Sequence, residues 1–132
     1  MPEELLDNPD KKTKILIVDD DPAVQTFLTT ILSGPRMDIE TAVDGFQAGI
    51  KVVYFMPQII ILDLFMPYLN GFEVCRHLKE DEKTRHIKIL VLTGQASEEN
   101  KEKVMSAGAD AFLPKPSNKA AILQSIDALL AG

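Results

Sequence analysis

The chain has 132 residues, of which 45% are hydrophobic and 26% charged, and its formal net charge is −6. These values predict one soluble globular domain with a single core, and the negative charge argues against direct nucleic-acid binding by this chain. No apolar run approaches the roughly 20 residues that a membrane-spanning helix needs, so we expect no membrane insertion.

The single cysteine indicates the cellular compartment of the protein, and the two ends of the chain indicate its domain boundaries. Cys75 has no partner for an internal disulfide and is compatible with the cytoplasm, where we expect the protein to reside. Residues 1–13 carry prolines and charges without the layout of a signal peptide, so we interpret them as an N-terminal extension. Residues 14–132 then form one domain. Because the sequence ends directly after the last predicted helix, we expect no second domain.

Strand-like and helix-like segments alternate from the start of that domain. Lys14–Val18 is a continuous aliphatic run of strand length. Asp21 followed by Pro22 predicts the start of a helix, with the aspartate as N-cap and the proline in the first turn. The apolar residues of this helix recur at helical spacing and predict one buried stripe, made of Val24, Phe27, Leu28, Ile31 and Leu32.

The pattern repeats in the next forty residues. A short second strand is predicted at Asp38–Val43. Asp44 would cap the second helix, and Pro57 would stop it. One face of that helix carries the apolar side chains Phe46, Ile50 and Val53. A third strand at Gln58–Leu62 is apolar after its first residue, and it ends at Asp63.

Three helices and two strands complete the pattern. In chain order they are a helix near Gly71–Glu80, a strand at Ile87–Leu92, a helix at Glu98–Ala107, a short strand at Ala111–Leu113, and a final helix that Ser117 would cap. The inward residues expected on these helices are Val74, Cys75 and Leu78 on the first, Val104, Met105 and Ala107 on the second, and Ile122, Leu123, Ile126, Leu129 and Leu130 on the third.

Five strands that alternate with five helices predict an α/β fold. Right-handed crossovers between parallel strands place helices on both faces of the sheet. The first, third and fourth strands are the most apolar, so we expect them at the centre. The predicted architecture is therefore a doubly wound five-stranded parallel sheet with strand order 2-1-3-4-5, the flavodoxin-like arrangement.

Polar residues stand at the carboxyl ends of the strands, where ligands bind in such folds. They are Asp19 and Asp20 after the first strand, Asp63 after the third, Thr93 after the fourth and Lys115 after the fifth. Three neighbouring carboxylates raise one another's pKa, and Mg²⁺ (or Mn²⁺), which prefers oxygen ligands, would remove that conflict. A carboxylate can also attack phosphorus, with the hydroxyl and the ammonium stabilising the phosphoryl oxygens.

Four motifs carry a family resemblance: ILIVDDDP, IIILDLFMPYLNGFEV, VLTG and GADAFLPKP. In this order and spacing they resemble the receiver domain of two-component response regulators, of the chemotaxis-regulator type, over Lys14 to Leu130. The resemblance implies that Asp63 is the phosphoacceptor. It further implies that Asp20 binds Mg²⁺ directly, that Asp19 acts mainly through water, and that the backbone carbonyl of Phe65 is another ligand.

The resemblance also implies a switch. Lys115 would pair with the phosphoryl group beside a cis Pro116, Thr93 would move toward that group, and Phe112 would turn inward on activation. The phosphoryl donor would be a sensor histidine kinase or a histidine phosphotransfer protein. A downstream protein would bind the face of the fourth helix, fifth strand and fifth helix. Residues 14–132 would thus be a receiver domain that acts in a phosphorelay and is not a turnover enzyme.

Phe65 and Gln95 stand at two positions that depart from the commoner family pattern or vary widely within the family. In the family these two positions tune the lifetime of the phosphoryl group. A phenylalanine there would shield the phosphoryl group from water, so we expect no unusually fast autodephosphorylation. Two alternative functions stay open. A Mg²⁺-dependent phosphohydrolase of the haloacid dehalogenase type also uses an aspartyl-phosphate, although Phe65 replaces its second acid. A receiver-like module that no longer accepts phosphate would act by docking alone, although such relatives usually lack one of the five polar residues.

Overall fold

A computed structural model of the protein describes residues 12–67 and 70–132. The strands are β1 (Thr13–Val18), β2 (Met37–Ala42), β3 (Ile59–Leu62), β4 (Lys88–Thr93) and β5 (Ala111–Pro114). The helices are α2 (Pro22–Leu32), α3 (Gly45–Phe55), α4 (Gly71–Glu80), α5 (Glu98–Ser106) and α6 (Lys119–Ala131). Most predicted boundaries differ from these by one residue. The extension predicted at residues 1–13 lies outside the described residues except for its last two positions, and β1 begins at Thr13.

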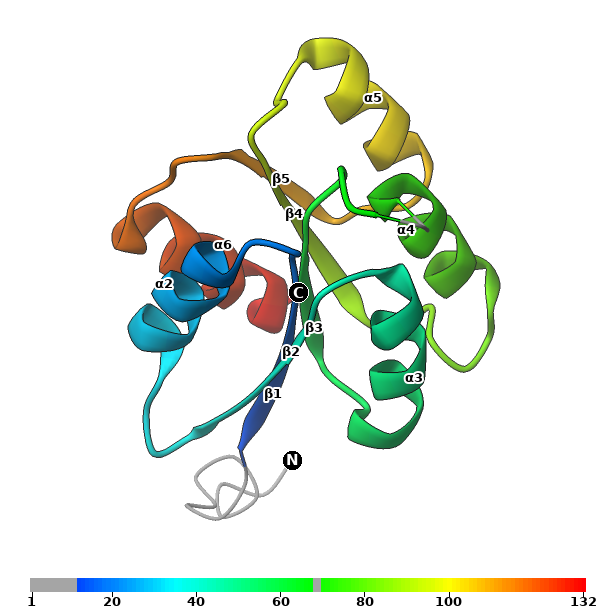
Figure 1. Cartoon of the computed structure of the whole chain (residues 1–132). Helices are drawn as coiled ribbons and strands as arrows, with labels where there is room; N and C mark the ends of the chain where they lie inside the picture. Colours follow the sequence, from blue (N-terminus) through cyan, green and yellow to red (C-terminus); the bar gives the residue numbers. More distant parts are fainter. Residues whose placement is uncertain (1–11, 68–69) are drawn as a thin grey trace.

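The sheet confirms the predicted fold class. All four strand pairings are parallel, and the strand order is β2-β1-β3-β4-β5. Helices α2 and α6 cover one face, and α3, α4 and α5 cover the other (Figure 1). The central pair is in register with Val18 opposite Leu62, so the ends of β1 and β3 lie side by side. None of the helices in the described part of the chain is long and apolar enough to cross a membrane.

The two central strands are apolar throughout because both of their faces are covered. Successive side chains point to opposite faces, so each strand contributes to two separate clusters. Ile15, Ile17, Ile59 and Ile61 pack toward α2 and α6, whereas Leu16, Val18, Ile60 and Leu62 pack toward α3, α4 and α5. All eight are at most 2% exposed. This double burial holds the ends of β1 and β3 in fixed positions.

Helix caps were predicted correctly at two positions and wrongly at a third. The side chains of Asp21 and Asp44 each accept a hydrogen bond from a backbone N–H in the first turn of α2 and α3. Ser117 is not the cap of α6. That cap is Asn118, and the Ser117 hydroxyl instead donates to the carbonyl oxygen of Pro114 at 2.6 Å. Asparagine and serine are about equally good N-caps, so the sequence favoured neither.

Helix α3 is rotated about its axis relative to the orientation predicted from its sequence. Its buried residues are Gly45, Ala48, Val52 and Phe55. Phe46, Ile50 and Val53, which share the predicted face, point away from the sheet and are 70%, 50% and 74% exposed. Because both sides of this helix are apolar, hydrophobic periodicity could not distinguish the inner side from the outer one.

The other predicted stripes are wider than the faces that are buried. In α2 the core residues are Leu28 and Leu32, while Phe27 is 43% exposed. Met105 of α5 and Leu130 of α6 are likewise exposed. In α4 all three predicted residues are buried, including Cys75, and burial raises the pKa of its thiol to about 11. This thiol is therefore a packing group and not a nucleophile.

Candidate functional site

The predicted polar residues meet at one edge of the sheet. The backbone N–H of Asp63 donates to Val18 O at 3.0 Å, and that of Asp19 donates to Ala42 O at 3.0 Å. These bonds continue the β1–β3 and β1–β2 pairings by one residue beyond the strands. The two aspartates are thus placed by the sheet itself, with their side chains almost fully buried.

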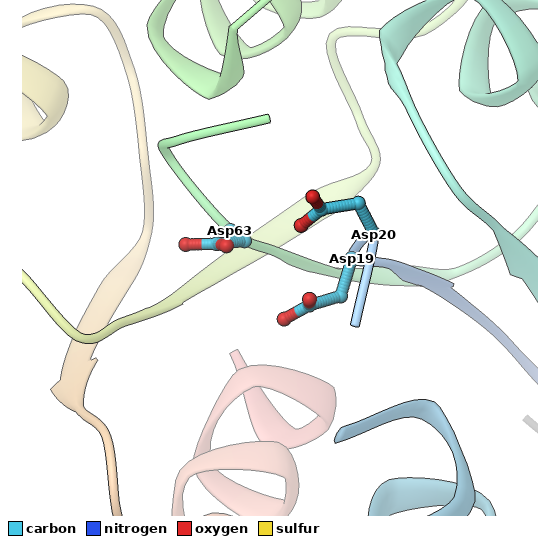
Figure 2. A group of neighbouring side chains, drawn as sticks. All are labelled: Asp19, Asp20 and Asp63. Atoms are coloured by element: carbon cyan, nitrogen blue, oxygen red, sulfur yellow. The ribbon is translucent and has the colours of Figure 1, made fainter. Parts of the chain in front are cut away.

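Three carboxylates gather at this edge (Figure 2). One oxygen from each of Asp19, Asp20 and Asp63 lies within 4.8 Å of the others. Asp19 and Asp63 are 3% and 7% exposed, whereas Asp20 is exposed. Such a set of oxygen donors, open to water on one side, fits a Mg²⁺ ion, which keeps several waters and takes one or two carboxylates. Asp21 stands apart from this cluster as the cap of α2.

Lys115 brings a positive charge between two of these acids. Its ammonium nitrogen lies 2.7 Å from Asp19 Oδ2 and 3.4 Å from Asp63 Oδ2. The backbone N–H of Lys115 donates to Thr93 O at 2.8 Å, which attaches the loop after β5 to the end of β4. The peptide bond from Lys115 to Pro116 is cis, as expected. The pairing of Lys115 with Asp19 was not predicted.

Burial and mutual contact shift the pKa values of Asp19 and Lys115. Loss of solvation raises the pKa of Asp19, and the hydrogen bond from Lys115 reverses only part of that shift. For Lys115, burial would lower the pKa, but the hydrogen bond to Asp19 and the charges of both acids outweigh it and leave the pKa raised. In the metal-free protein, ionised Asp19 therefore costs stability, and this cost appears as the pH rises above the ordinary value of 3.8. The favourable contribution of Lys115 is complete below 10.5 and is lost only above it.

Comparison with known proteins decides the family. The family model described as "Response regulator receiver domain" matches residues 15–127. The chain belongs to the response regulator receiver domain family. This receiver domain is 38% identical over 117 residues to the DNA-binding dual master transcriptional regulator RpaA of Synechocystis sp., a match that covers 89% of this chain and 48% of RpaA.

Other relatives agree with this assignment. Response regulator MprA of Mycobacterium sp. (strain KMS) is 39% identical over 117 residues, which cover 89% of this chain and 50% of MprA. The receiver domain thus spans about half the length of these two relatives. The solved structure of chemotaxis protein CheY4 of Vibrio cholerae superposes with a TM-score of 0.83 at 30% identity, covering 89% of this chain and 98% of that one. These matches do not favour the phosphohydrolase alternative.

Thr93 is the last residue of β4 in the receiver domain, and Phe112 lies on the adjacent strand β5, opposite Val91. Thr93 is 1% exposed, and its hydroxyl oxygen accepts a hydrogen bond from the backbone of Gln95 at 3.3 Å. A Cβ at neighbouring Gly94 would meet no atom within 4 Å, so the space beside Thr93 is open there. Phe112 is half-buried against the cluster on the α3–α5 face. The five polar residues therefore occupy the same edge, which does not favour a docking-only module.

Phe65 follows the acid cluster in the β3–α4 loop. It is 41% exposed, and its ring meets the ring of Phe72 edge to face, with 6.0 Å between the centroids. The ammonium of Lys103 lies 4.3 Å from the centroid of the Phe72 ring. A chain of contacts thus connects the loop beside Asp63 to α5.

Two positioning residues of the receiver domain were missed by the sequence analysis. Gln25 of α2 donates from its side-chain amide to Asp19 O at 2.7 Å and to Ala42 O at 3.3 Å, which joins the ends of β1 and β2. Gly71 begins α4 directly against Asp63. A Cβ at Gly71 would stand 2.3 Å from Asp63 O, closer than any real contact. The glycine after the Asn70 cap was a signal for this, because tight backbone approach requires glycine.

A hollow of about 890 Å³ lies beside Lys115, between α2 and the loop that leads to α6. Val24 and Phe27 line one side of it, and Pro116 and Asn118 line the other. Its position explains why Phe27 is left exposed although it belongs to the apolar stripe of α2. The hollow offers an apolar surface next to the acid cluster.

Neutralising Asp20 is expected to raise the melting temperature of the metal-free receiver domain by a few degrees. Asp20→Asn removes one of three carboxylates from the cluster, and with it repulsion that Lys115, which is paired with the other two acids, does not offset directly. Thermal unfolding with EDTA and with Mg²⁺ measures this. The parent protein should gain stability from Mg²⁺ and the variant much less. A variant that melts well below the metal-free parent would contradict the assignment of Asp20 to a repulsive cluster.

Proposed function

We propose that this receiver domain is a phosphorylation-controlled switch in which Asp63 accepts a phosphoryl group. The observation that carries the proposal is the position of the Lys115 ammonium, 3.4 Å from Asp63 Oδ2 and 2.7 Å from Asp19 Oδ2, at the buried edge of the sheet. A cation held between two buried carboxylates, with a third acid nearby, suits phosphoryl transfer better than structural support.

In the proposed reaction a carboxylate oxygen of Asp63 attacks the phosphorus of a phosphohistidine. The new O–P bond forms as the P–N bond breaks, and the imidazole leaves with the electron pair of that bond. Lys115 is placed to neutralise charge on the transferred oxygens, and Thr93 is placed to donate a hydrogen bond to them. Mg²⁺ held by Asp19, Asp20 and Asp63, with the Phe65 carbonyl as a further ligand, would supply additional positive charge.

The donor we propose is a sensor histidine kinase or a histidine phosphotransfer protein. Such a donor must bring its histidine to Asp63 over the neighbouring surface, and the hollow beside Lys115 is apolar enough to bind it. We propose that the protein acts in the cytoplasm, because a chain with one cysteine and no internal disulfide suits reducing conditions.

A substitution of Phe27 distinguishes docking of the donor from the phosphoryl transfer itself. Phe27→Asp is expected to slow transfer from a phosphohistidine protein at least about tenfold, because it places a charge on the apolar wall of the hollow. The rate with acetyl phosphate should be unchanged, because that donor needs no docking surface. Radiolabel transfer measures both rates, and Leu130→Asp on α6, equally exposed at 43%, is the matched control. Equal loss with both donors would show that Phe27 acts on the site itself.

The output we propose is a changed affinity of the α5–β5–α6 face for a downstream protein. Thr93 at the end of β4 and Phe112 on β5 would shift together between two states. The contact of Phe65 with Phe72, and of Phe72 with Lys103, offers a second connection from the phosphorylated loop to α5. In this mechanism the domain turns over no external substrate, so it acts as a switch and not as an enzyme.

The proposal is tested with Mg²⁺ and acetyl phosphate, followed by intact-mass measurement. We expect the mass to rise by one phosphoryl group in the parent and not in Asp63→Asn. We also expect a half-life longer than seconds, in line with Phe65 beside the acceptor. No gain in mass with acetyl phosphate or with any phosphohistidine donor would refute the proposed function.

A further inference from the structure

Helix α3 is apolar on two opposite sides. Its inner side packs Ala48, Val52 and Phe55 into the core. Its outer side presents Phe46, Ile50, Val53 and Tyr54, which we call the α3 patch and which are 70%, 50%, 74% and 62% exposed. A surface helix normally turns a polar face to water, and a helix that is apolar all round is normally buried. The α3 patch therefore has the character of an interface.

The size of the α3 patch is informative. A buried aromatic side chain covers about 150–250 Å², so two largely exposed rings with two aliphatic side chains between them present roughly 500 Å². That is near the upper end for the largest apolar patch of a monomer. If two such patches met, they would bury roughly 1,000 Å² in total, the lower limit for a specific interface. The area suits weak, reversible association of two copies.

We propose that the α3 patch binds the α3 patch of a second copy of this chain, forming a symmetric dimer. Charge favours this occupant. The chain carries a net charge of −6, so two copies repel each other wherever acidic surfaces meet. Helix α3 has no acidic residue, and its one charged side chain, Lys51, is paired with Glu40 at 3.5 Å. Two copies can therefore approach through α3 without bringing acidic side chains of this helix together.

The spacing of the patch is self-complementary. Phe46, Ile50 and Tyr54 are four residues apart and form one ridge along α3. Beside the ridge, a Cβ at Gly49 would meet no atom within 4 Å, which leaves a groove on the outer surface. With a twofold axis at Ile50, Phe46 of one copy packs against the partner's Tyr54, and each ridge lies in the other's groove. Helices that pack by such ridges cross at about −50°.

The proposed dimer is separate from the switch. In Figure 1 α3 lies on the opposite face of the sheet from α2 and α6, which leaves the hollow beside Lys115 uncovered. The α5–β5–α6 face is also left free. Association through α3 therefore needs no phosphoryl group. It can be measured in the absence of any phosphodonor. A failure to associate would leave the proposed function untouched.

Sedimentation velocity over a concentration series tests the dimer. We expect a monomer–dimer equilibrium with a dissociation constant in the micromolar to submillimolar range. Ile50→Asp should weaken association at least about tenfold, because two carboxylates would meet at the axis. Val53→Lys is a second variant should the first fail to fold, which thermal unfolding checks. The matched control is Leu130→Asp on α6, which should leave the equilibrium unchanged.

A crosslink tests the geometry. Ile50→Cys should give a disulfide-linked dimer under mild oxidation, because both copies place this residue at the axis, while Cys75 is buried and does not compete. Leu130→Cys should not crosslink at a comparable rate. Three results would overturn the proposal: monomers throughout the concentration series, a dimer that survives both α3 variants, or a dimer that dissociates on Leu130→Asp instead.

Discussion

Gly71→Ala is expected to lower the free energy of unfolding by about 3 kcal/mol. The added methyl group would stand 2.3 Å from Asp63 O and 2.7 Å from Leu64 Cα, and both of these are backbone atoms of buried residues that directly follow β3. Relief of this contact requires α4 or the loop after β3 to move. Protein that still folds should therefore also accept phosphate more slowly, because Asp63 is displaced relative to Lys115. Chemical denaturation measures the first effect, and the rate of acetyl phosphate labelling measures the second.

The matched control is the same substitution at Gly49. This glycine is inside α3, and a Cβ there would meet nothing within 4 Å. Gly49→Ala should raise the free energy of unfolding by about 0.5–1 kcal/mol, because alanine favours the helix, and it should leave the labelling rate unchanged. If Gly71→Ala proved as harmless as Gly49→Ala, the close approach of α4 to Asp63 would not be a feature of the folded protein.

Lys115→Met is expected to slow phosphoryl acceptance by Asp63 at least about a hundredfold. The variant keeps most of the side-chain volume and removes the charge that lies 3.4 Å from Asp63 Oδ2. It also leaves Asp19 buried with no cation at 2.7 Å. The metal-free variant should therefore lose about 2 kcal/mol of stability at neutral pH.

The pH dependence of that loss identifies its cause. Burial already raises the pKa of Asp19 while Lys115 is present, and removing Lys115 raises it further. Protonation of Asp19 relieves the unpaired charge, so the stability gap between parent and variant should narrow as the pH falls below neutrality. The control is Lys119→Met, at an exposed lysine of α6 that forms no ion pair within the described part of the chain. A gap that is constant from neutral to acidic pH would contradict the pairing of Lys115 with Asp19.

Much of the fold could be predicted because its signals are local. Ile15–Val18 and Ile59–Leu62 are short apolar runs without interruption and rich in isoleucine, which is the pattern of a strand covered on both faces. The candidate site followed from the same fact. In a parallel sheet the carboxyl ends of all strands meet at one edge, so the sequence alone assigns the polar residue at the end of each strand to that edge.

Other features could not be predicted, because they depend on how elements pack. The rotation of α3 about its axis could not be predicted, because the helix is apolar on both sides and its pattern does not show which side faces the sheet. The close approach of Gly71 to Asp63, which would put an added Cβ 2.3 Å from Asp63 O, depends on where α4 begins relative to β3. The sequence of neither element specifies that position. The pairing of Lys115 with Asp19 joins residues 96 positions apart, and spacing along the chain carries no information about it.

The most direct test of the central claim is to locate the phosphoryl group. The parent protein, labelled with acetyl phosphate in the presence of Mg²⁺, is treated with borohydride, which reduces an acyl phosphate to an alcohol, and its peptides are sequenced by mass spectrometry. The account predicts a reduced residue at Asp63 and unmodified side chains at Asp19 and Asp20. Modification at either of those two acids, or at no carboxylate at all, would contradict it.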